Sequence, residues 1–268
     1  MTNGIKVHIL ECGAMGTDIE WLLCSPKNRA SRTDRHKPAT WLSVATHAVL
    51  IEHPEGTILW DATPSRDWET EWAGSGLDEM APYDQVEEHQ YLDSRLRQLG
   101  YETGDIDQVI LSHLHMDHAG GAKLFDNGHT RLVVNETELT EALAFDGFFS
   151  GGHIKRVYEG LTFDTVSGDV EIVPGVTLLE TPGHTWGTMS LKVDLPNDGP
   201  MIFTSDAVYL EESLEQRHWG SAVWDNRAWL RSVDRLVAIA EKENATMVFG
   251  HDAAQMATLR HGPDAFYS

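Results

Sequence analysis

Four side chains that commonly bind metal ions lie within six residues of one another, between positions 113 and 118. They follow the apolar run 109–111, which is typical of a buried strand. Side chains two positions apart in a strand point to the same side, so His113 and His115 are predicted to share one cation. Asp117 and His118 follow directly and indicate a second cation beside the first. The alternative is a run of solvated surface histidines without a ligand.

Three later segments each place a further donor where an apolar strand is predicted to end. A binuclear centre needs them, because zinc-like ions take about four donors each. Loops at strand ends gather around a rigid sheet edge, where sites are commonly built. The three donors are His184, which lies in a Pro-Gly turn, Asp206 and His251.

With these residues in place, the chain resembles the metallo-β-lactamase superfamily. Its signature His-x-His-x-Asp-His is matched from position 113 to position 118. The resemblance implies an αββα sandwich, with residues 1–268 forming one hydrolase domain. It also implies that one metal is bound by His113, His115 and His184. The other metal is then bound by Asp117, His118 and His251, and Asp206 bridges the two.

Three details resemble one branch of this superfamily, the N-acyl homoserine lactonases that hydrolyse quorum-sensing signals. Tyr209 follows the bridging aspartate by three positions, residues 249–252 match the last ligand motif, and residues 50–61 match an early hairpin ending in Asp61. One departure is visible, because the usual Asp-Thr-Gly after the hairpin is Asp-Ala-Thr here. The conformation of the turn after Asp61 is therefore not predicted. The alternatives are an ordinary packed tyrosine at 209 and a simple turn cap at 61.

The resemblance implies a mechanism for opening a cyclic ester. Two divalent metals, zinc first and iron, cobalt or manganese as alternatives, lower the pKa of a bridging water from about 15.7 toward neutrality and yield a hydroxide. Tyr209 donates a hydrogen bond to the developing oxyanion, and Asp117 carries a proton to the leaving oxygen.

Other activities share the same ligands. The substrate is alternatively another lactone, such as a pyridoxolactone or a γ-butyrolactone from a catabolic route. A thioesterase similar to glyoxalase II is a further alternative, and outside enzymes the chain is alternatively a metal-dependent ligand sensor.

The composition of the chain limits the classes of partner that we expect it to bind. The chain of 268 residues carries 42 acidic and 20 basic residues, a formal net charge of −22, which argues against a nucleic-acid ligand. No apolar run approaches the length of a membrane span, and no signal-peptide core follows Met1, so we expect a cytoplasmic protein that does not enter membranes. Cys12 and Cys24 lack the spacing of a zinc knuckle or disulfide framework and are expected to be free thiols.

Hydrophobic patterning predicts two similar halves of strands with interspersed helices. The predicted strands are 6–10, 48–52, 57–61, 108–111, 131–134, 170–173, 176–180, 189–193, 201–204 and 246–249. The predicted helices are 86–99, 136–144, which opens with Asn135 and Glu138 as a capping pair, and 228–242.

The substrate pocket is less clearly marked. By analogy with lactonases, Met15, Trp21 and Trp41 are predicted to line an acyl-chain channel, although such residues are often ordinary core. Either the basic insert 25–38 or the loop 63–83 is expected to cover the metals as a lid. Residues 145–158, which include Phe148 and Phe149, are expected to form a third wall of the pocket or, alternatively, a surface loop. The basic insert alternatively faces the second subunit of a homodimer.

Overall fold

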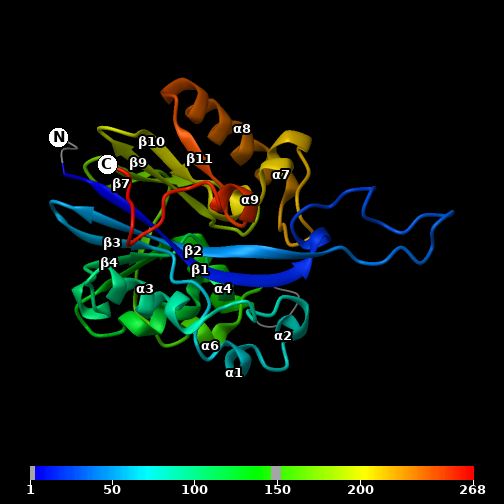
Figure 1. The fold of residues 1–268 in the computed structure, drawn as a ribbon, viewed down its shortest axis with the longest axis horizontal. Coiled ribbons are helices and arrows are strands. Elements are labelled where there is room, and N and C mark those ends of the chain that lie inside the picture. The colour runs from blue at the N-terminus through cyan, green and yellow to red at the C-terminus, as the bar shows by residue number, and fades with distance from the viewer. Residues whose placement is uncertain (1–3, 146–151) are drawn as a thin grey trace.

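Two β-sheets pack face to face in the computed structural model, which describes residues 4–145 and 152–268 (Figure 1). The first sheet has, in spatial order, β1 (Lys6–Asp18), β2 (Trp41–His53), β3 (Gly56–Trp60), β4 (Gln108–Ile110), β5 (Arg131–Asn135) and β6 (Phe163–Val166). The second has β11 (Thr246–Val248), β10 (Gly199–Phe203), β9 (Met189–Leu195), β8 (Val176–Glu180) and β7 (Val170–Val173). The strands β3 to β6 run parallel to one another, so their carboxyl ends meet at one edge of the first sheet.

Alternating side chains of the central strands explain why the sheets stack. Trp60 of β3 shares the core between the sheets with Met201 and Phe203 of β10. Leu59 and Ile202, one position along, point to the opposite faces and join the two outer cores beneath the helices. Each sheet therefore buries both faces, because successive strand residues point to opposite sides.

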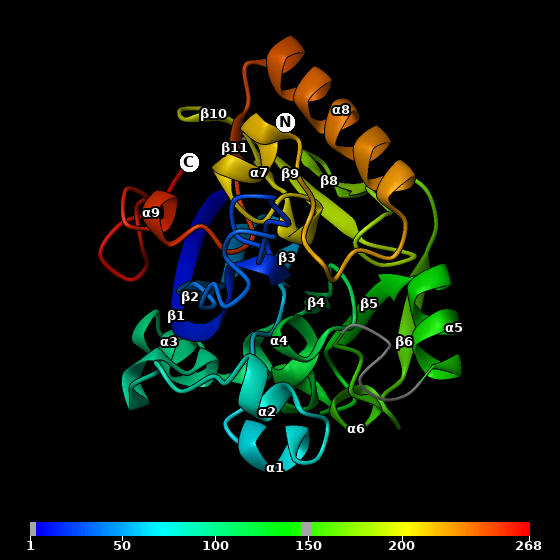
Figure 2. The ribbon, with the colours of Figure 1, turned by 90° about the vertical axis from the view of Figure 1, so that its right-hand side faces the viewer.

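Helices cover the outer faces of both sheets (Figure 2). The helices packed with the first sheet are α1 (Trp68–Trp72), α2 (Leu77–Met80), α3 (Leu92–Gln98), α4 (Met116–Ala119), α5 (Glu136–Ala144) and α6 (Lys155–Tyr158). On the second sheet lie α7 (Glu211–Gln216) and α8 (Asn226–Glu243), while α9 (Ala253–Met256) contacts β2. The 3-10 turns are η1 (Ile19–Trp21), η2 (Glu88–Gln90), η3 (Thr103–Asp105), η4 (Gly120–Phe125) and η6 (Ser205–Ala207). This helix, sheet, sheet, helix order confirms the predicted αββα sandwich.

Most predicted elements are present, but the short helices α1, α2, α4, α6, α7 and α9 were not predicted, and other elements differ as well. Strand β6 was not predicted, because its middle residues are exposed and it lies at a sheet edge, so its sequence lacks a strong apolar pattern. The predicted helix 86–99 contains a 3-10 turn first and becomes helical only at Leu92. Strands β1 and β2 are 13 residues each, far longer than expected.

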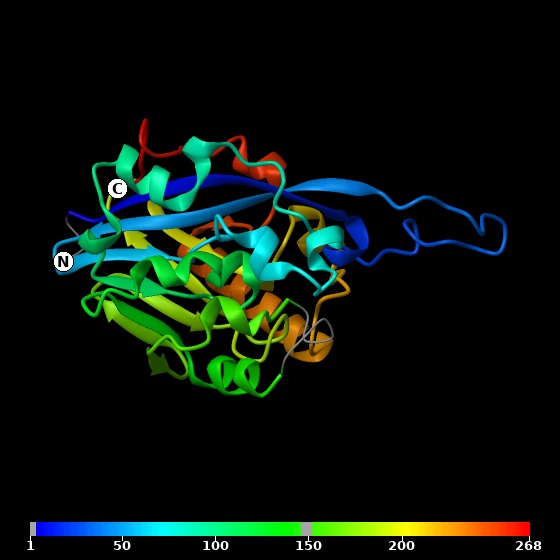
Figure 3. The same ribbon diagram turned by 90° about the horizontal axis from the view of Figure 1, so that it is seen from below.

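The long β1 and β2 strands form a ribbon that leads into an extended arm. After η1, Leu22 and Leu23 are buried, and residues 26–40 then project away from the two sheets as the arm (Figure 3). The arm contains nearly all of the basic insert 25–38. Cys12 and Cys24 are both free, as predicted. Among the helices of residues 4–145 and 152–268, none has the length and apolar character needed to cross a membrane.

Candidate metal centre

The first four donors leave the sheet at the end of β4. That strand stops at Ile110, so His113 and His115 lie in the loop beyond it, and Asp117 and His118 lie in α4. The prediction that strand alternation aligns the two histidines is therefore wrong. A loop followed at once by a helical turn brings the four side chains together instead.

The two glycines after α4 let this loop pack against the end of β3. A Cβ atom on Gly120 would lie 2.6 Å from the Ser65 nitrogen, and one on Gly121 would lie 2.4 Å from the Ala62 carbonyl oxygen. Both distances are too short for any side chain. The glycine pair of the motif therefore serves close backbone packing, and the Gly121 N–H donates to the Thr63 carbonyl across this contact.

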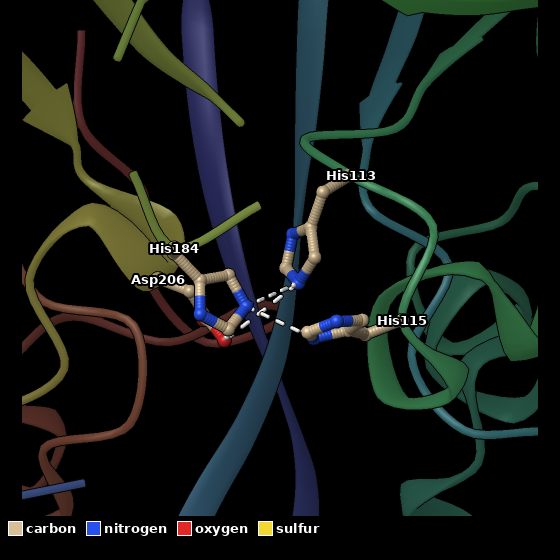
Figure 4. A group of neighbouring side chains, drawn as sticks. All are labelled: His113, His115, His184 and Asp206. Carbon is tan, nitrogen blue, oxygen red and sulfur yellow. Dashed lines mark hydrogen bonds and ion pairs between the residues drawn. The ribbon is translucent and has the colours of Figure 1, made fainter. Parts of the chain in front are cut away.

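Figure 4 shows four side chains that converge on one point, His113, His115, His184 and Asp206, which we name the first cluster. His184 Nε2 lies 3.1 Å from His113 Nε2 and 2.9 Å from His115 Nδ1. Asp206 Oδ2 lies 3.1 Å from the same His184 nitrogen. All four side chains are buried.

A second cluster of donors lies directly beside the first and consists of Asp117, His118 and His251. Asp117 Oδ2 lies 3.5 Å from His118 Nε2 and 3.4 Å from His251 Nε2. The other oxygen of Asp206, Oδ1, lies 3.1 Å from His118 Nε2 and 3.2 Å from His251 Nε2. Asp206 thus presents one oxygen to each cluster.

The ring nitrogens that face away from the clusters are held by the surrounding protein. His113 Nδ1 lies 2.9 Å from Ser112 Oγ, and His251 Nδ1 lies 2.9 Å from the Ala45 carbonyl oxygen. His184 Nδ1 lies 2.7 Å from the hydroxyl of Tyr209. Such partners set the tautomer and orientation of an imidazole, leaving the inward nitrogen free to bind.

Asp61 holds His118 in the same way, despite the departure in the turn that follows it. Its Oδ2 lies 2.8 Å from His118 Nδ1, while its Oδ1 accepts a 2.7 Å hydrogen bond from the Ser112 N–H. Thr63 adopts a φ of 55°, a left-handed conformation that favours glycine. The turn therefore keeps a glycine-type shape with threonine in it, and Asp61 keeps its place beside the donors.

Burial and neighbouring charges shift the pKa values of these groups. Burial lowers the pKa of His113 well below its usual range, and the adjacent imidazole of His118 acts in the same direction. Burial also lowers the pKa of His118, but carboxylates led by Asp206 outweigh it and raise that pKa well above its usual range. Burial raises the pKa of Asp206, but imidazoles led by His118 hold it well below its usual range. The pKa of Tyr209 is raised well above its usual range by burial and by Asp206, so its hydroxyl keeps its proton.

The donor set fits divalent metal ions. His118 Nε2 and Asp206 Oδ1 are buried and lie 3.1 Å apart as an ion pair, but neither makes a hydrogen bond of good geometry within the described residues. Buried polar atoms without partners are costly, and a cation between the inward-facing nitrogens and oxygens satisfies both atoms. Imidazole and carboxylate groups, in numbers near four per ion, are the ligands that zinc and similar metals take.

An apolar pocket opens beside the two clusters. Its polar end includes Asp117, Asp206 and Tyr209. Its apolar wall, which we name the pocket wall, is formed by Met15, Trp21, Leu22, Val44, Leu77, Ala81, Met116 and Ala222. An extended molecule with one polar end and one apolar end matches this distribution.

The structure separates the pocket residues predicted from sequence. It places Met15 and Trp21 in the pocket wall, whereas Trp41 is 54% exposed, with its indole against Gly16, and is not among the described residues lining the pocket. The loop 63–83 contributes Leu77 and Ala81, while no residue of the insert 25–38 lines this pocket. Phe148 and Phe149 lie outside the described residues.

Two buried polar residues near the clusters were not predicted to belong to the site, Glu138 and His153. The sequence marked Glu138 only as a helix-capping residue, and the Asn135 side chain does cap α5. The Glu138 carboxylate instead lies 2.8 Å from His153 Nε2. Burial raises its pKa, but the charge of His153 and the hydrogen bonds to the carboxylate, led by that from His153, together hold the pKa below its usual range. A helix pattern cannot reveal a partner that lies in another loop.

Comparisons with known proteins agree with this geometry. The sequence profile of the metallo-beta-lactamase superfamily matches residues 43–251. An N-acyl homoserine lactonase of Bacillus thuringiensis is 33% identical over 231 residues, covering 85% of this chain and 89% of that protein. The N-acyl homoserine lactonase AttM of Rhizobium radiobacter is 31% identical, covering 98% of this chain and 99% of its own.

A solved structure gives the same picture. It is an N-acyl homoserine lactone hydrolase with the product N-hexanoyl-L-homoserine bound at its catalytic metal centre. Its sequence is 29% identical to this chain, and the two structures superpose with a TM-score of 0.83. The superposition covers 98% of each chain. The similarity therefore extends over the sheets, the helices and the loops that carry the donors.

Proposed function

Because the chain belongs to the metallo-beta-lactamase superfamily, we propose that it is a metal-dependent hydrolase that opens the ring of N-acyl homoserine lactones. The observation that carries this proposal is the apolar pocket that ends on two clusters of metal-type donors and the Tyr209 hydroxyl. An acyl homoserine lactone has a polar ring for the donors and an apolar chain for the pocket wall. The lactonase names of the relatives support the same substrate class.

We propose that two divalent cations bind here, one to His113, His115 and His184, and the other to the second cluster. Asp206 is proposed to serve both, because each of its oxygens faces one cluster. When bound, such ions supply Lewis acidity and a nucleophilic water at neutral pH. Zinc is our proposed metal, while iron, cobalt and manganese also suit imidazole and carboxylate donors.

Tyr209 is proposed to stabilise the carbonyl oxygen as it gains negative charge. With Nε2 of His184 facing the first cluster, Nδ1 carries the ring proton and donates it to the Tyr209 oxygen, 2.7 Å away. The phenolic proton is then available to the substrate. A donor already held in place needs no reorganisation during the reaction.

Asp117 is proposed to move the proton. Ring opening breaks the bond between the carbonyl carbon and the ring oxygen, and the departing alkoxide must be protonated. Asp117 lines the pocket and is 8% exposed, so its carboxylate can accept the proton of the attacking water and deliver it to that oxygen. The products balance as one open-chain hydroxy acid per lactone and water.

Proton release tests the proposal, since each ring opened yields one acid. Metal-loaded protein in weak buffer is offered acyl homoserine lactones of short and long chain, a simple γ-lactone and a thioester. We expect rapid acidification with the acyl homoserine lactones and none with an Asp206→Ala variant. Turnover of the γ-lactone or thioester alone would overturn the proposed substrate and retain only a metal-dependent hydrolase.

We also infer that the arm contacts a second copy of this chain. Its insert 25–38 carries five basic residues and one acidic residue, in a chain of formal charge −22: Lys27, Arg29, Arg32, Arg35 and Lys37 against Asp34. Figure 3 shows the arm extending away from the two sheets. Opposite charge favours docking on the acidic surface of another copy.

Light scattering tests this dimer. The protein is expected to have twice the monomer mass at low salt and to dissociate as salt rises, because exposed charge pairs are screened. An Arg32→Glu, Arg35→Glu variant should be monomeric, whereas Arg231→Glu, an exposed arginine on α8, should not change the mass. A monomer at every salt concentration would exclude the contact.

A further inference from the structure

Glu138 connects two loops that carry metal-type donors but belong to different sheets. Its Oε1 accepts a 3.0 Å hydrogen bond from the Leu114 N–H, between His113 and His115. Its Oε2 accepts a 3.1 Å hydrogen bond from the Gly187 N–H, three residues after His184. One carboxylate therefore spans the loop that follows β4 and the loop that joins β8 to β9.

The same carboxylate also holds His153, which packs on His115. Glu138 Oε1 lies 2.8 Å from His153 Nε2, and the centroids of the His153 and His115 rings are 4.4 Å apart. The neighbouring Gly152 completes this contact, because its carbonyl accepts a 3.0 Å hydrogen bond from the Met116 N–H. A Cβ at position 152 would lie only 3.0 Å from the His115 ring.

His115 is thus held differently from the other imidazoles. His113 and His184 are oriented by hydroxyl groups at their outward nitrogens. The ring of His115 is packed between the rings of His113 and His153, and the Glu138 carboxylate is hydrogen-bonded to His153. Glu138 itself is fully buried, so water does not compete for its hydrogen bonds.

We propose that Glu138 is a positioning residue for the first cluster. It keeps the His113 and His115 loop at the distance from His184 that a shared cation requires, and it presses His153 against His115. Residues that orient metal ligands typically change metal affinity about 10- to 100-fold when replaced. The cation of the first cluster should therefore depend on Glu138 more strongly than the cation of the second. This inference rests on the proposed metal centre but not on the identity of the lactone.

The test compares Glu138→Gln with Glu136→Gln, the same substitution at an exposed glutamate in the same helical turn. Glutamine keeps the size of the side chain but replaces one carboxylate oxygen by an NH2 group, so one of the two backbone N–H groups would face a donor instead of an acceptor. Cobalt(II) is titrated into each metal-free protein, and binding is followed by the visible absorption of the ion. We expect one of two binding steps to weaken about 10- to 100-fold with an altered spectrum in Glu138→Gln, and no change in Glu136→Gln.

A second variant, Glu138→Asp, keeps both oxygens and the charge and should restore part of the lost affinity. Unchanged cobalt affinity and spectrum in Glu138→Gln would overturn the proposal. So would a lower unfolding temperature with unchanged affinity, because that result assigns Glu138 to stability alone. If the unaltered protein binds cobalt as expected but hydrolyses no lactone, the proposed substrate fails while the role of Glu138 stands.

Discussion

The donor clusters and the pocket wall lie side by side but are held by different forces. Each imidazole of the clusters is oriented by a specific neighbour, such as Asp61 for His118 or Tyr209 for His184. The pocket wall is made of apolar side chains from separate segments, such as Met15 of β1 and Leu77 of α2. Directional bonds tolerate little displacement, whereas apolar contacts adapt to changes of shape.

This difference predicts that substitutions in the clusters and in the pocket wall affect the reaction in different ways. A change in the clusters removes a group that acts on the reacting atoms, so it should reduce turnover for every substrate. A change in the pocket wall alters only apolar contact area, and a methylene in such a pocket is worth about 1–3 kcal/mol. Its effect should depend on the acyl chain.

The largest effect is expected from Asp117→Asn. The amide cannot carry the proton, so kcat should fall about a thousandfold for all lactones, within the range of general acid–base catalysis. Steady-state kinetics measure the change, and circular dichroism verifies that the fold is retained. Asp126→Asn, at an exposed aspartate, is the control. Near-normal turnover in the Asp117 variant would eliminate its role in proton transfer.

Tyr209→Phe should have a smaller effect, with kcat about 10- to 100-fold lower. Loss of an oxyanion donor commonly costs more, but the proposed cations would, when bound, also polarise that oxygen. The variant also leaves His184 Nδ1 without its partner, which costs about 1–3 kcal/mol of stability. Kinetics are therefore recorded well below the unfolding temperature. A rise in KM at constant kcat would show that the hydroxyl serves binding alone.

The smallest of these effects is expected from Trp21→Ala in the pocket wall. KM should rise about tenfold for a long-chain lactone and little for a short one, because only the long chain reaches the lost apolar surface. Trp41→Ala is the matched control and should leave both values unchanged, since Trp41 is mostly exposed. An equal rise in KM for the long-chain and the short-chain lactone in Trp21→Ala would contradict this difference between the clusters and the pocket wall.

The sequence predicted the donors of the clusters more completely than the residues that surround them. The donors could be predicted because each belongs to a short motif at a predicted strand end, as with His184 after β8 and Asp206 after β10. The reason given for His113 and His115 failed, since a loop and not a strand aligns them. Glu138 was assigned to a helix cap because its hydrogen-bond partners are far away in the chain.

The sequence by itself therefore identifies the donors, because four of them lie within residues 113–118 and each of the other three follows a predicted strand. The tertiary structure alone decides what surrounds these donors: Glu138 between two loops, the pocket wall drawn from distant segments, and an arm that leaves the sheets. The physical reason is that hydrophobic contact has no direction and no fixed spacing along the chain. Which apolar residues meet depends on how two whole sheets pack, and no short motif records that packing.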